Sequence, residues 1–269
     1  MIGVAGCGRM GAPMLAALRK AGFDAKGFDI RPSCEFGPLE PHVTNNAAEF
    51  AQNLGTLITV VRDIAQTDDV LFGAQNFTSA NSLKRIIICS TLSPRYVRAL
   101  RDQIPDHITL IDAPMSGAQI AAEEARLSFM LGGEPAEIED CNPIFAAMGT
   151  HFHKMGPFGA GMQAKVLNNL LAASNTAMTR LVLDWADQAG LDETALLNLI
   201  HTSSGQNWFA SNFNDIEFAR DGLAPDNTIA ILVKDVASAL DAAPEGADTA
   251  LPETVQAAIS KLPPRPSSC

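Results

Sequence analysis

A lysine and an asparagine lie one helical turn apart in an otherwise largely apolar segment. Lys165 and Asn169 belong to the stretch GMQAKVLNNLL, residues 161–171, whose pattern predicts a helix. Positions four apart share one face of an α-helix, so the ammonium and amide groups should point into the same space. Such a pair could move a proton to or from a substrate oxygen and orient that oxygen. Spacing alone nevertheless favours the simpler alternative, a helix lysine whose stem leads its charge to solvent.

The motif GCGRMG, residues 6–11, stands between a predicted strand and a predicted helix. The apolar run 1–5 suits a buried parallel strand, and the helical pattern after the motif ends at Gly22. In a dinucleotide-binding unit, the first glycine permits a tight turn, the second lets the backbone approach a pyrophosphate, and the third allows close helix packing. A glycine-rich turn without a cofactor is the alternative. The residues predicted to bind a cofactor here are Gly6, Gly8, Arg9, Met10 and Gly11.

An acidic residue follows at the end of the second predicted strand. Asp29 lies 18 residues after Gly11, where a carboxylate can accept hydrogen bonds from the adenosine ribose hydroxyls. The same carboxylate would repel the 2′-phosphate of NADP, so NAD is the predicted cofactor and NADP the less favoured one. Arg31 tempers this preference, because its guanidinium could turn toward a phosphate, although a solvated surface arginine is the commoner role.

The apolar runs further along the chain predict an α/β fold. Three of them lie at 56–62, 85–90 and 108–114. Their alternation with helical stretches is typical of a Rossmann-type doubly wound parallel sheet, whose ligands gather at the carboxyl ends of the strands. After Lys165, alanine- and leucine-rich helices replace the strands. We therefore predict a dinucleotide-binding domain over residues 1–160 and an all-α domain over residues 161–269, and expect the tail PPRPSSC to be mobile.

Two loops follow predicted strands at the edge where cofactor and substrate should lie. STLSP offers Ser90 and Thr91, and DAPMSGA contains Ser116, Gly117 and Ala118. Small residues in the second loop would expose backbone N–H groups beside the serine hydroxyl, which suits a carboxylate ligand of an acidic protein. An ordinary serine-glycine turn is the alternative.

Composition argues against several kinds of partner. The 269-residue chain carries a formal net charge of −11, whereas nucleic acid or an anionic membrane requires a concentrated basic surface. No apolar segment is long enough to span a bilayer. The cysteines form no CxxC pair and the histidines no HExxH motif, so we expect no metal site and no disulfide framework. Without a recognisable secretory signal, a cytoplasmic protein is expected.

Four segments together resemble the signatures of the β-hydroxyacid dehydrogenase family, which includes 3-hydroxyisobutyrate dehydrogenase and is related to 6-phosphogluconate dehydrogenase. In order they are GCGRMG (6–11), DAPMSGAQIAAEEARLSFMLGG (112–133), GPFGAGMQAKVLNNLL (156–171) and KDV (234–236). The resemblance spans nearly the whole chain and implies a Rossmann domain, a long interdomain helix and an all-helical second domain. It also implies an oxidoreductase that transfers a hydride between NAD(P) and a short 3-hydroxy acid or its semialdehyde, in a homo-oligomer such as a dimer or tetramer.

The resemblance gives the polar pair a role. Lys165 matches the family's catalytic lysine, and Asn169 matches the asparagine that orients the substrate hydroxyl or carbonyl. Burial and the positive charge of the oxidised nicotinamide should lower the pKa of this lysine toward neutrality, so that it can exchange a proton with the substrate. An imine reductase-like enzyme of the same fold generally lacks a lysine at this position. That enzyme and a non-catalytic NAD-binding protein are the alternatives.

The other implied site residues lie in loops and in a later helix. They are the substrate-carboxylate residues Ser116, Gly117 and Ala118, the nicotinamide-loop residues Ser90 or Thr91, and Lys234, which closes on substrate and cofactor. The substrate loop departs from the family where glycine is usual, at Ala118, Ile120 and Ala125, which implies a tighter pocket or a different acid. Arg126 could reach a second anionic group, with a surface arginine as the alternative. The identity of the acid and the direction of reaction are not encoded in these motifs.

Overall fold

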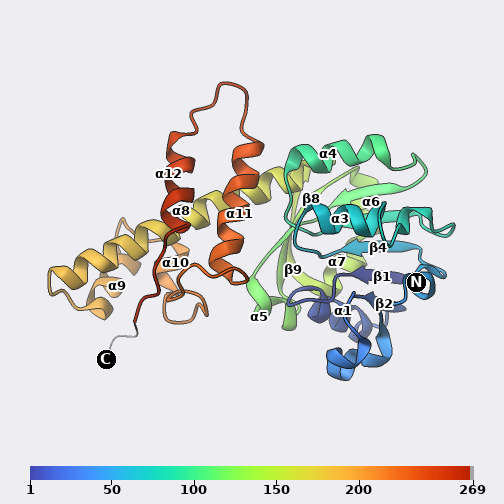
Figure 1. Cartoon of the computed structure of the whole chain (residues 1–269), viewed down its shortest axis with the longest axis horizontal. Helices are drawn as coiled ribbons and strands as arrows, with labels where there is room; N and C mark the ends of the chain where they lie inside the picture. Colours follow the sequence, from blue (N-terminus) through green and yellow to red (C-terminus); the bar gives the residue numbers. More distant parts are fainter. Residues whose placement is uncertain (267–269) are drawn as a thin grey trace. The chain divides into compact units, whose positions relative to one another are not determined.

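The computed structural model describes residues 1–266 of a chain with two compact units (Figure 1). By its contacts the chain divides into Met1–Lys165 and Val166–Cys269, and residues 267–269, with Cys269, lie outside the described part. This division and the boundary predicted between residues 160 and 161 both fall near the start of helix α8, Ala160–Gln188.

A nine-stranded sheet forms the centre of the first unit as far as the structure describes it. Its strands follow the order β3-β2-β1-β4-β5-β6-β8-β7, with β9 paired to β8. Every neighbouring pair from β3 to β6 is parallel, which confirms the predicted doubly wound α/β fold. The strands are β1 Ile2–Ala5, β2 Ala25–Phe28, β3 Val43–Thr44, β4 Thr56–Thr59, β5 Arg85–Ile88, β6 Thr109–Asp112, β7 Met115–Ser116, β8 Leu127–Gly132 and β9 Gly149–Gly156.

Alternate residues of the central strands face two separate hydrophobic cores. Ile58 and Ile87 lie in one core with Met14 of α1, whereas Leu57 and Ile86 lie in the other. Successive side chains of a strand point to opposite faces, so both faces of this sheet are buried, as a parallel sheet covered by helices requires. The helices of this unit are α1 Gly11–Lys20, α2 Ala47–Ala51, α3 Ile64–Leu71, α4 Pro94–Gln103, α5 Ala118–Glu123, α6 Pro135–Asp140 and α7 Asn142–Met148, with 3-10 turns at Ser33–His42 and Phe77–Ser79.

The far end of the sheet contains antiparallel pairs, which the apolar runs in the sequence did not predict. Strand β8 runs antiparallel to both β6 and β7, and β9 then pairs with β8 in parallel. Each residue of β9 after Gly149 is exposed. Because neither face of the strand is buried, its sequence lacks the alternation of apolar and polar residues by which strands are predicted. Strand β7 lies within the predicted substrate loop 112–118, and β8 lies in the remainder of the signature 112–133, for which no strand was predicted.

The second unit is entirely helical within the described residues. Helix α8 enters it and packs against α11 and α12 in one small core, and against α9 and α10 in another. The first core contains Ala173 and Val236, and the second core contains Leu183 and Phe209. This arrangement confirms the predicted helical region. The helices are α9 Glu193–His201, α10 Trp208–Ser211, α11 Thr228–Asp241 and α12 Ala250–Ile259.

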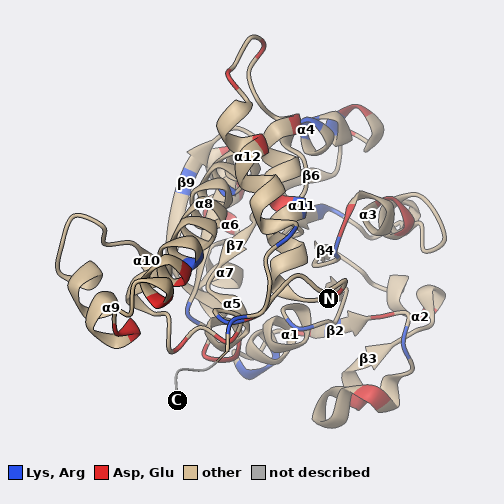
Figure 2. Cartoon of the chain, turned by 60° about the vertical axis from the view of Figure 1, so that its left-hand side comes forward, with Lys and Arg blue, Asp and Glu red and all other residues tan. Residues whose placement is uncertain are grey.

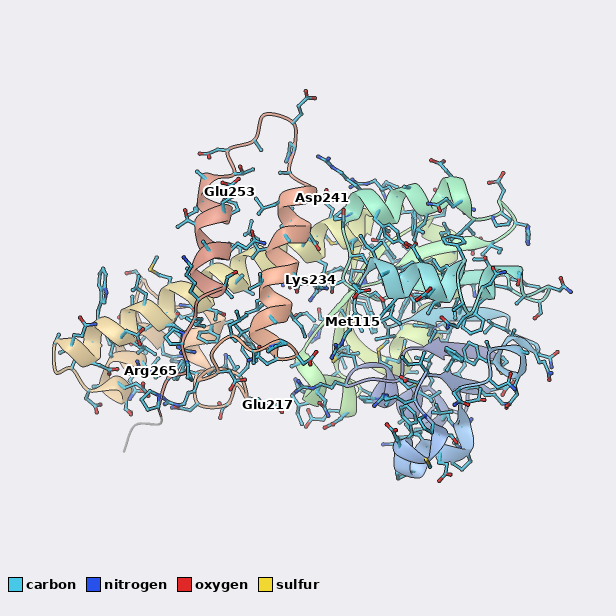
Figure 3. All side chains as sticks on the ribbon, viewed as in Figure 1. Met115, Glu217, Lys234, Asp241, Glu253 and Arg265 are labelled. Atoms are coloured by element: carbon cyan, nitrogen blue, oxygen red, sulfur yellow. The ribbon has the colours of Figure 1, made fainter. Side chains whose placement is uncertain are left out.

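Residues 263–266 are anchored rather than mobile, contrary to expectation. The side chain of Arg265, labelled in Figure 3, is only 5% exposed. Its guanidinium nitrogens lie 2.8 Å from an Asp184 carboxylate oxygen and 2.7 Å from a carboxylate oxygen of buried Glu193. The Arg180 guanidinium donates a hydrogen bond to the Pro263 carbonyl oxygen. The prediction was wrong because an arginine in a proline-rich tail gives no sign of the carboxylates that face it.

Charged side chains are distributed over both units. Figure 2 shows Lys and Arg interspersed with Asp and Glu along the ribbon, in line with the net charge of −11. Among the helices of residues 1–266, none is both long enough and apolar enough to cross a membrane.

Candidate functional site

The motif of residues 6–11 forms the turn between β1 and α1. Gly6 has a φ of +94°, and its amide donates to the Phe28 carbonyl oxygen of β2 at 2.9 Å. A Cβ on Gly11 would lie 1.9 Å from the Gly6 carbonyl oxygen, so a side chain there is impossible without moving the turn. A Cβ on Gly8 would meet no atom within 4 Å. The backbone is therefore open at Gly8, beside the start of a helix, which fits the approach of a pyrophosphate.

The two side chains of the same motif have different surroundings. Arg9 is exposed, and its Nε donates to the Gln119 Oε1 of helix α5 at 3.2 Å. Met10 is half-buried against the core that contains α1. The motif is thus connected through Arg9 to the segment that was predicted to hold the substrate carboxylate.

Asp29, directly after β2, is a buried hydrogen-bond acceptor. One carboxylate oxygen accepts from the Cys7 amide at 2.9 Å, and the other accepts from the Arg31 amide at 3.1 Å and the Arg31 Nε at 3.0 Å. Burial raises the pKa of Asp29, but the hydrogen bonds and charge of Arg31 and the Cys7 amide outweigh it, so the pKa lies below its ordinary value. Arg31 is therefore ion-paired, not simply solvated, and it also stacks over the Phe36 ring at 4.7 Å.

Ser90 organises the loop ends at the carboxyl edge of the sheet. Its buried hydroxyl oxygen accepts a hydrogen bond from the Val61 amide at 2.9 Å, which joins the loop after β4 to the loop after β5. Thr91, next in the chain, is only partly buried. Of the two residues predicted near the nicotinamide, Thr91 is the more open to a ligand.

The predicted carboxylate loop has an unusual backbone. Ser116 ends β7, Gly117 has a φ of +137°, and Ala118 begins helix α5 with a φ of +52°. Ala125, after the same helix, has a φ of +53°. Both alanines occupy the left-handed region that favours glycine, which agrees with the glycines usual at these positions in the resembled family. Arg126 pairs with Glu124 and is half exposed, as the surface alternative predicted.

Lys165 is a buried lysine on α8. The residue is only 8% exposed, which is contrary to the alternative of a helix lysine whose ammonium group reaches solvent. Asn169 follows it by four residues on the same helix and is also 8% exposed. The shared face deduced from spacing is therefore a covered face, and both polar groups lie on it.

The second unit holds Asn169 in a chain of polar contacts. The Asn169 Nδ2 donates to the Asp235 Oδ2 of α11 at 2.6 Å, and the Lys234 Nζ lies 3.2 Å from the Asp235 Oδ1. Figure 3 labels Lys234 on α11. Asp235 is 2% exposed and fixes which way the Asn169 amide faces. This role of Asp235 was not predicted, although an acidic residue inside the apolar pattern TIAILVKDV is a usable signal.

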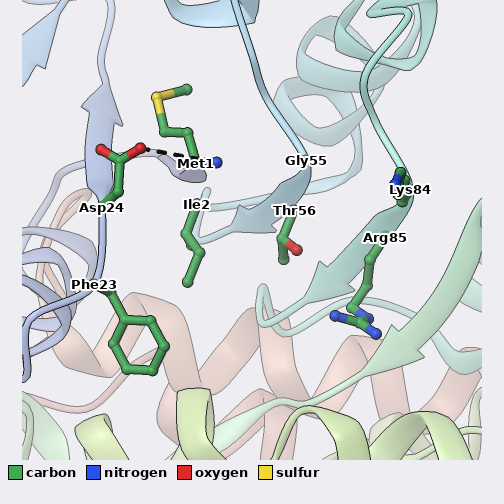
Figure 4. A pocket seen from close by; sticks show the side chains of 8 residues that line it. All are labelled: Met1, Ile2, Phe23, Asp24, Gly55, Thr56, Lys84 and Arg85. Carbon is green, nitrogen blue, oxygen red and sulfur yellow. Dashed lines mark ion pairs between the residues drawn. The ribbon is translucent and has the colours of Figure 1, made fainter.

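A surface hollow of about 360 Å³ lies away from these residues. Figure 4 shows its lining, which includes Ile2, Thr56 and Arg85 at the starts of β1, β4 and β5. Parallel α/β sheets bind ligands at the opposite, carboxyl ends of their strands, so this hollow is not the candidate site. In residues 1–266, no three His, Cys, Asp or Glu side chains are grouped so that they could hold a metal ion.

Family models match both parts of the chain. Residues 1–156 match the NAD binding domain of 6-phosphogluconate dehydrogenase. Residues 159–261 match the domain described as NAD-binding of NADP-dependent 3-hydroxyisobutyrate dehydrogenase. The two matches cover the sheet unit and the helical unit in the order that the motifs predicted.

Individual proteins agree with the family models. The mitochondrial 3-hydroxyisobutyrate dehydrogenase of Drosophila melanogaster is 32% identical over 218 residues, which cover 80% of this chain and 67% of that protein. The L-threonate dehydrogenase of Cupriavidus necator is 28% identical over 247 residues, or 90% and 83% of the two chains. The structure of a Mycobacterium tuberculosis 3-hydroxyisobutyrate dehydrogenase with L-serine superposes with a TM-score of 0.80, at 27% identity over 97% of this chain and 95% of the other.

Replacing Ala118 or Ala125 with glycine should stabilise the protein. Each alanine adopts a left-handed φ, and relief of that strain should raise the free energy of unfolding by about 0.5 to 1 kcal/mol per site, measured by urea denaturation. Ala99→Gly, on the exposed side of α4, is the matched control and should lower that free energy by about 1 kcal/mol. Equal destabilisation by all three substitutions would show that the loop alanines are not strained.

Proposed function

The chain belongs to the β-hydroxyacid dehydrogenase family, and we propose that it oxidises a short 3-hydroxy acid to its semialdehyde or keto acid with NAD. The observation that carries the proposal is the buried Lys165, which follows an open dinucleotide turn and a serine-glycine loop in the same chain. In this proposal residues 1–160 bind the cofactor and residues 161–269 form the helical domain.

Proton transfer is the task we propose for Lys165. When bound, the cofactor supplies the hydride chemistry. Lys165, as a neutral amine, takes the proton from the substrate hydroxyl during oxidation, and its ammonium returns that proton to the carbonyl oxygen during reduction. A lysine 8% exposed is shielded from bulk water, which would otherwise compete for the proton.

Substrate orientation is the task we propose for the remaining polar groups. The Asn169 Nδ2 donates to Asp235 and the Asn169 Oδ1 accepts from the Asn168 Nδ2, and the second N–H of the Asn169 amide is directed at the reacting oxygen. Ser116, Gly117 and Ala118 hold the substrate carboxylate, and Lys234 adds positive charge for substrate or cofactor. The alanines in this loop narrow it relative to glycine and favour a short acid, in keeping with the hydroxy acids in the names of the relatives.

NAD is the cofactor we propose, with NADP less favoured. The Asp29 carboxylate is buried and ionised, since its pKa is lowered, and it stands where a 2′-phosphate would add a second negative charge. Arg31 is already engaged by this carboxylate through its Nε and Nη2 atoms. A 2′-phosphate would have to separate that pair before Arg31 could bind it.

We also propose a homo-oligomer, a dimer or tetramer, in the cytoplasm. Helix α8 carries exposed apolar residues at alternating intervals of three and four, and partly buried Ser174 fills the remaining position of the pattern. Spacing of this kind forms a seam that packs against another helix. The exposed residues of the seam are Leu167, Leu171, Met178, Leu181 and Trp185, between 42% and 67% exposed.

Removal of the Lys165 amine should lower turnover without weakening cofactor binding. Lys165→Ala is expected to lower kcat by at least about 100-fold for the best of a panel of short 2- and 3-hydroxy acids, because proton transfer loses its base. The NADH dissociation constant, titrated by fluorescence, should change less than threefold or so. Parallel loss of both properties would contradict the role of Lys165, and a wild-type protein that binds NADH but turns over no acid would favour the non-catalytic alternative.

Removing the charge of Asp29 should change cofactor choice. In Asp29→Asn, the repulsion of a 2′-phosphate is lost and Arg31 is released, so the ratio of kcat/KM with NAD to that with NADP should fall about tenfold. Asp24→Asn is the matched control, because this carboxylate near the start of β2 has a side chain 80% exposed, and its substitution should leave the ratio unchanged. A wild-type enzyme that uses NADP better than NAD would overturn the preference.

Charging the α8 seam should dissociate the oligomer. Leu171→Glu combined with Met178→Glu is expected to convert the protein to a monomer in light scattering after gel filtration, since buried carboxylates in an apolar seam are unfavourable. Leu251→Glu on α12, a position 72% exposed and outside the seam, is the matched control. A wild-type monomer at micromolar concentration would contradict the proposal.

A further inference from the structure

A fully buried carboxylate stands at the start of helix α8. Asp112, the last residue of β6, is 0% exposed. Its Oδ1 accepts a hydrogen bond from the Gly159 amide at 2.6 Å, and its Oδ2 accepts one from the Met162 amide at 2.5 Å. The first amides of an α-helix have no partner within the helix. Asp112 therefore caps α8 from a strand 47 to 50 residues earlier in the chain, and its negative charge faces the positive end of the helix.

Close backbone packing surrounds this carboxylate. A Cβ on Gly132 of β8 would lie 2.2 Å from the Asp112 Oδ1, and a Cβ on Gly161 would lie 2.2 Å from the Met130 carbonyl oxygen. The helix start, the end of β6 and the end of β8 are thus in backbone contact. A longer side chain such as glutamate cannot replace Asp112 without moving one of them.

Two more contacts fix the same helical turn to the first unit. The Met162 Sδ accepts from the Leu92 amide at 3.3 Å, next to Thr91 in the predicted nicotinamide loop. The Arg98 Nη2 of α4 donates to the Gln163 Oε1 at 3.3 Å. Met162 is bonded both through its amide to Asp112 and through its sulfur to this loop, and Lys165 follows it by three residues on the helix.

We propose that Asp112 is the positioning residue of Lys165: its carboxylate sets the rotation and height of the first turns of α8, and thereby the place of the lysine amine relative to the cofactor-binding sheet. The inference rests on the proposed function of Lys165. In this proposal Asp112 does not contact the substrate or the cofactor and acts only through the helix. Its loss would change the rate by displacing the turn that carries Lys165.

Ionisation of Asp112 adds a pH dependence to this geometry. Burial raises the pKa of Asp112 to about 6, against the lowering effect of the Gly159 and Met162 amides. The charged and titratable groups facing it are Arg98 on α4, which lowers its pKa, and the buried thiol of Cys89 beyond β5. Below about pH 6 the protonated group presents an O–H where one amide needs an acceptor, so one of the two cap bonds is lost.

Asp112→Asn tests the proposal with little change in shape. Its amide keeps one acceptor oxygen and replaces the other by a donor, so we expect kcat to fall about 10- to 100-fold while KM for NAD changes less than about threefold. Amide hydrogen exchange of residues 159–165 should become faster. Asp192→Asn is the matched control: Asp192 caps α9 by accepting from the Ala195 amide at 2.7 Å, and its substitution should leave kcat unchanged.

The pH profile distinguishes positioning from titration of Lys165. In the reductive direction, with a semialdehyde and NADH, protonation of Lys165 alone should raise the rate as pH falls. Protonation of Asp112 should instead lower kcat below about pH 6 in the wild type, and Asp112→Asn should lack this decline. At pH 5 the wild type should then resemble Asp112→Asn measured at the same pH, both in kcat and in the protection of residues 159–165 from exchange.

The possible results lead to separate conclusions. Faster exchange of residues 159–165 together with reduced kcat and unchanged KM for NAD supports the positioning role. Faster exchange with unchanged kcat, or unchanged exchange, overturns it. A wild-type protein without activity on any hydroxy acid refutes the proposed function, and hydrogen exchange then still decides whether Asp112 holds the turn that carries Lys165.

Discussion

The buried carboxylate of Asp112 joins the sheet to the helix on which the proposed chemistry depends. Its pKa of about 6, compared with an ordinary 3.8, means that ionisation at neutral pH lowers the free energy of unfolding by about 3 kcal/mol, a cost that develops as pH rises from about 4 to 6. Two backbone amides of α8 offset part of the desolvation. The proposed role accounts for keeping a fully buried group that destabilises the fold when charged, because its two bonds determine the position of the first turn of α8.

Local pairing of charges accounts for how an acidic chain can bind anionic ligands. Asp29 is neutralised by Arg31, and Asp235 lies against Lys234 and the Asn169 amide. In each case a buried carboxylate fixes the direction of a neighbouring donor. The net charge of −11 therefore describes the surface as a whole, while backbone amides and a few oriented cations determine the character of the candidate site.

Local patterns in the sequence predicted the elements that depend on local interactions. The turn at residues 6–11 and the parallel strands follow from glycine spacing and apolar runs. Helical periodicity predicts that Lys165 and Asn169 share a face, but spacing alone favoured a solvent-directed lysine, and only the resemblance to a dehydrogenase family indicated a buried one. Partners brought together by tertiary folding left no such pattern. Asp112 reads as the last residue of an apolar strand, and nothing in its neighbourhood indicates that α8 starts beside it; the carboxylates that enclose Arg265 are equally distant in the chain.

The boundary between the two compact units falls within α8, between Lys165 and Asn169. Lys165 is the last residue of the sheet unit, and Asn169 lies in the helical unit with its partner Asp235. The lysine is thus anchored by Asp112 and the first turn of α8, whereas the asparagine is anchored by α11. Because a continuous helix spans the boundary, the rise and rotation of four helical residues fix the relation between the two groups. A continuous helix places the two side chains four positions apart on one face, which explains why both polar residues lie on it.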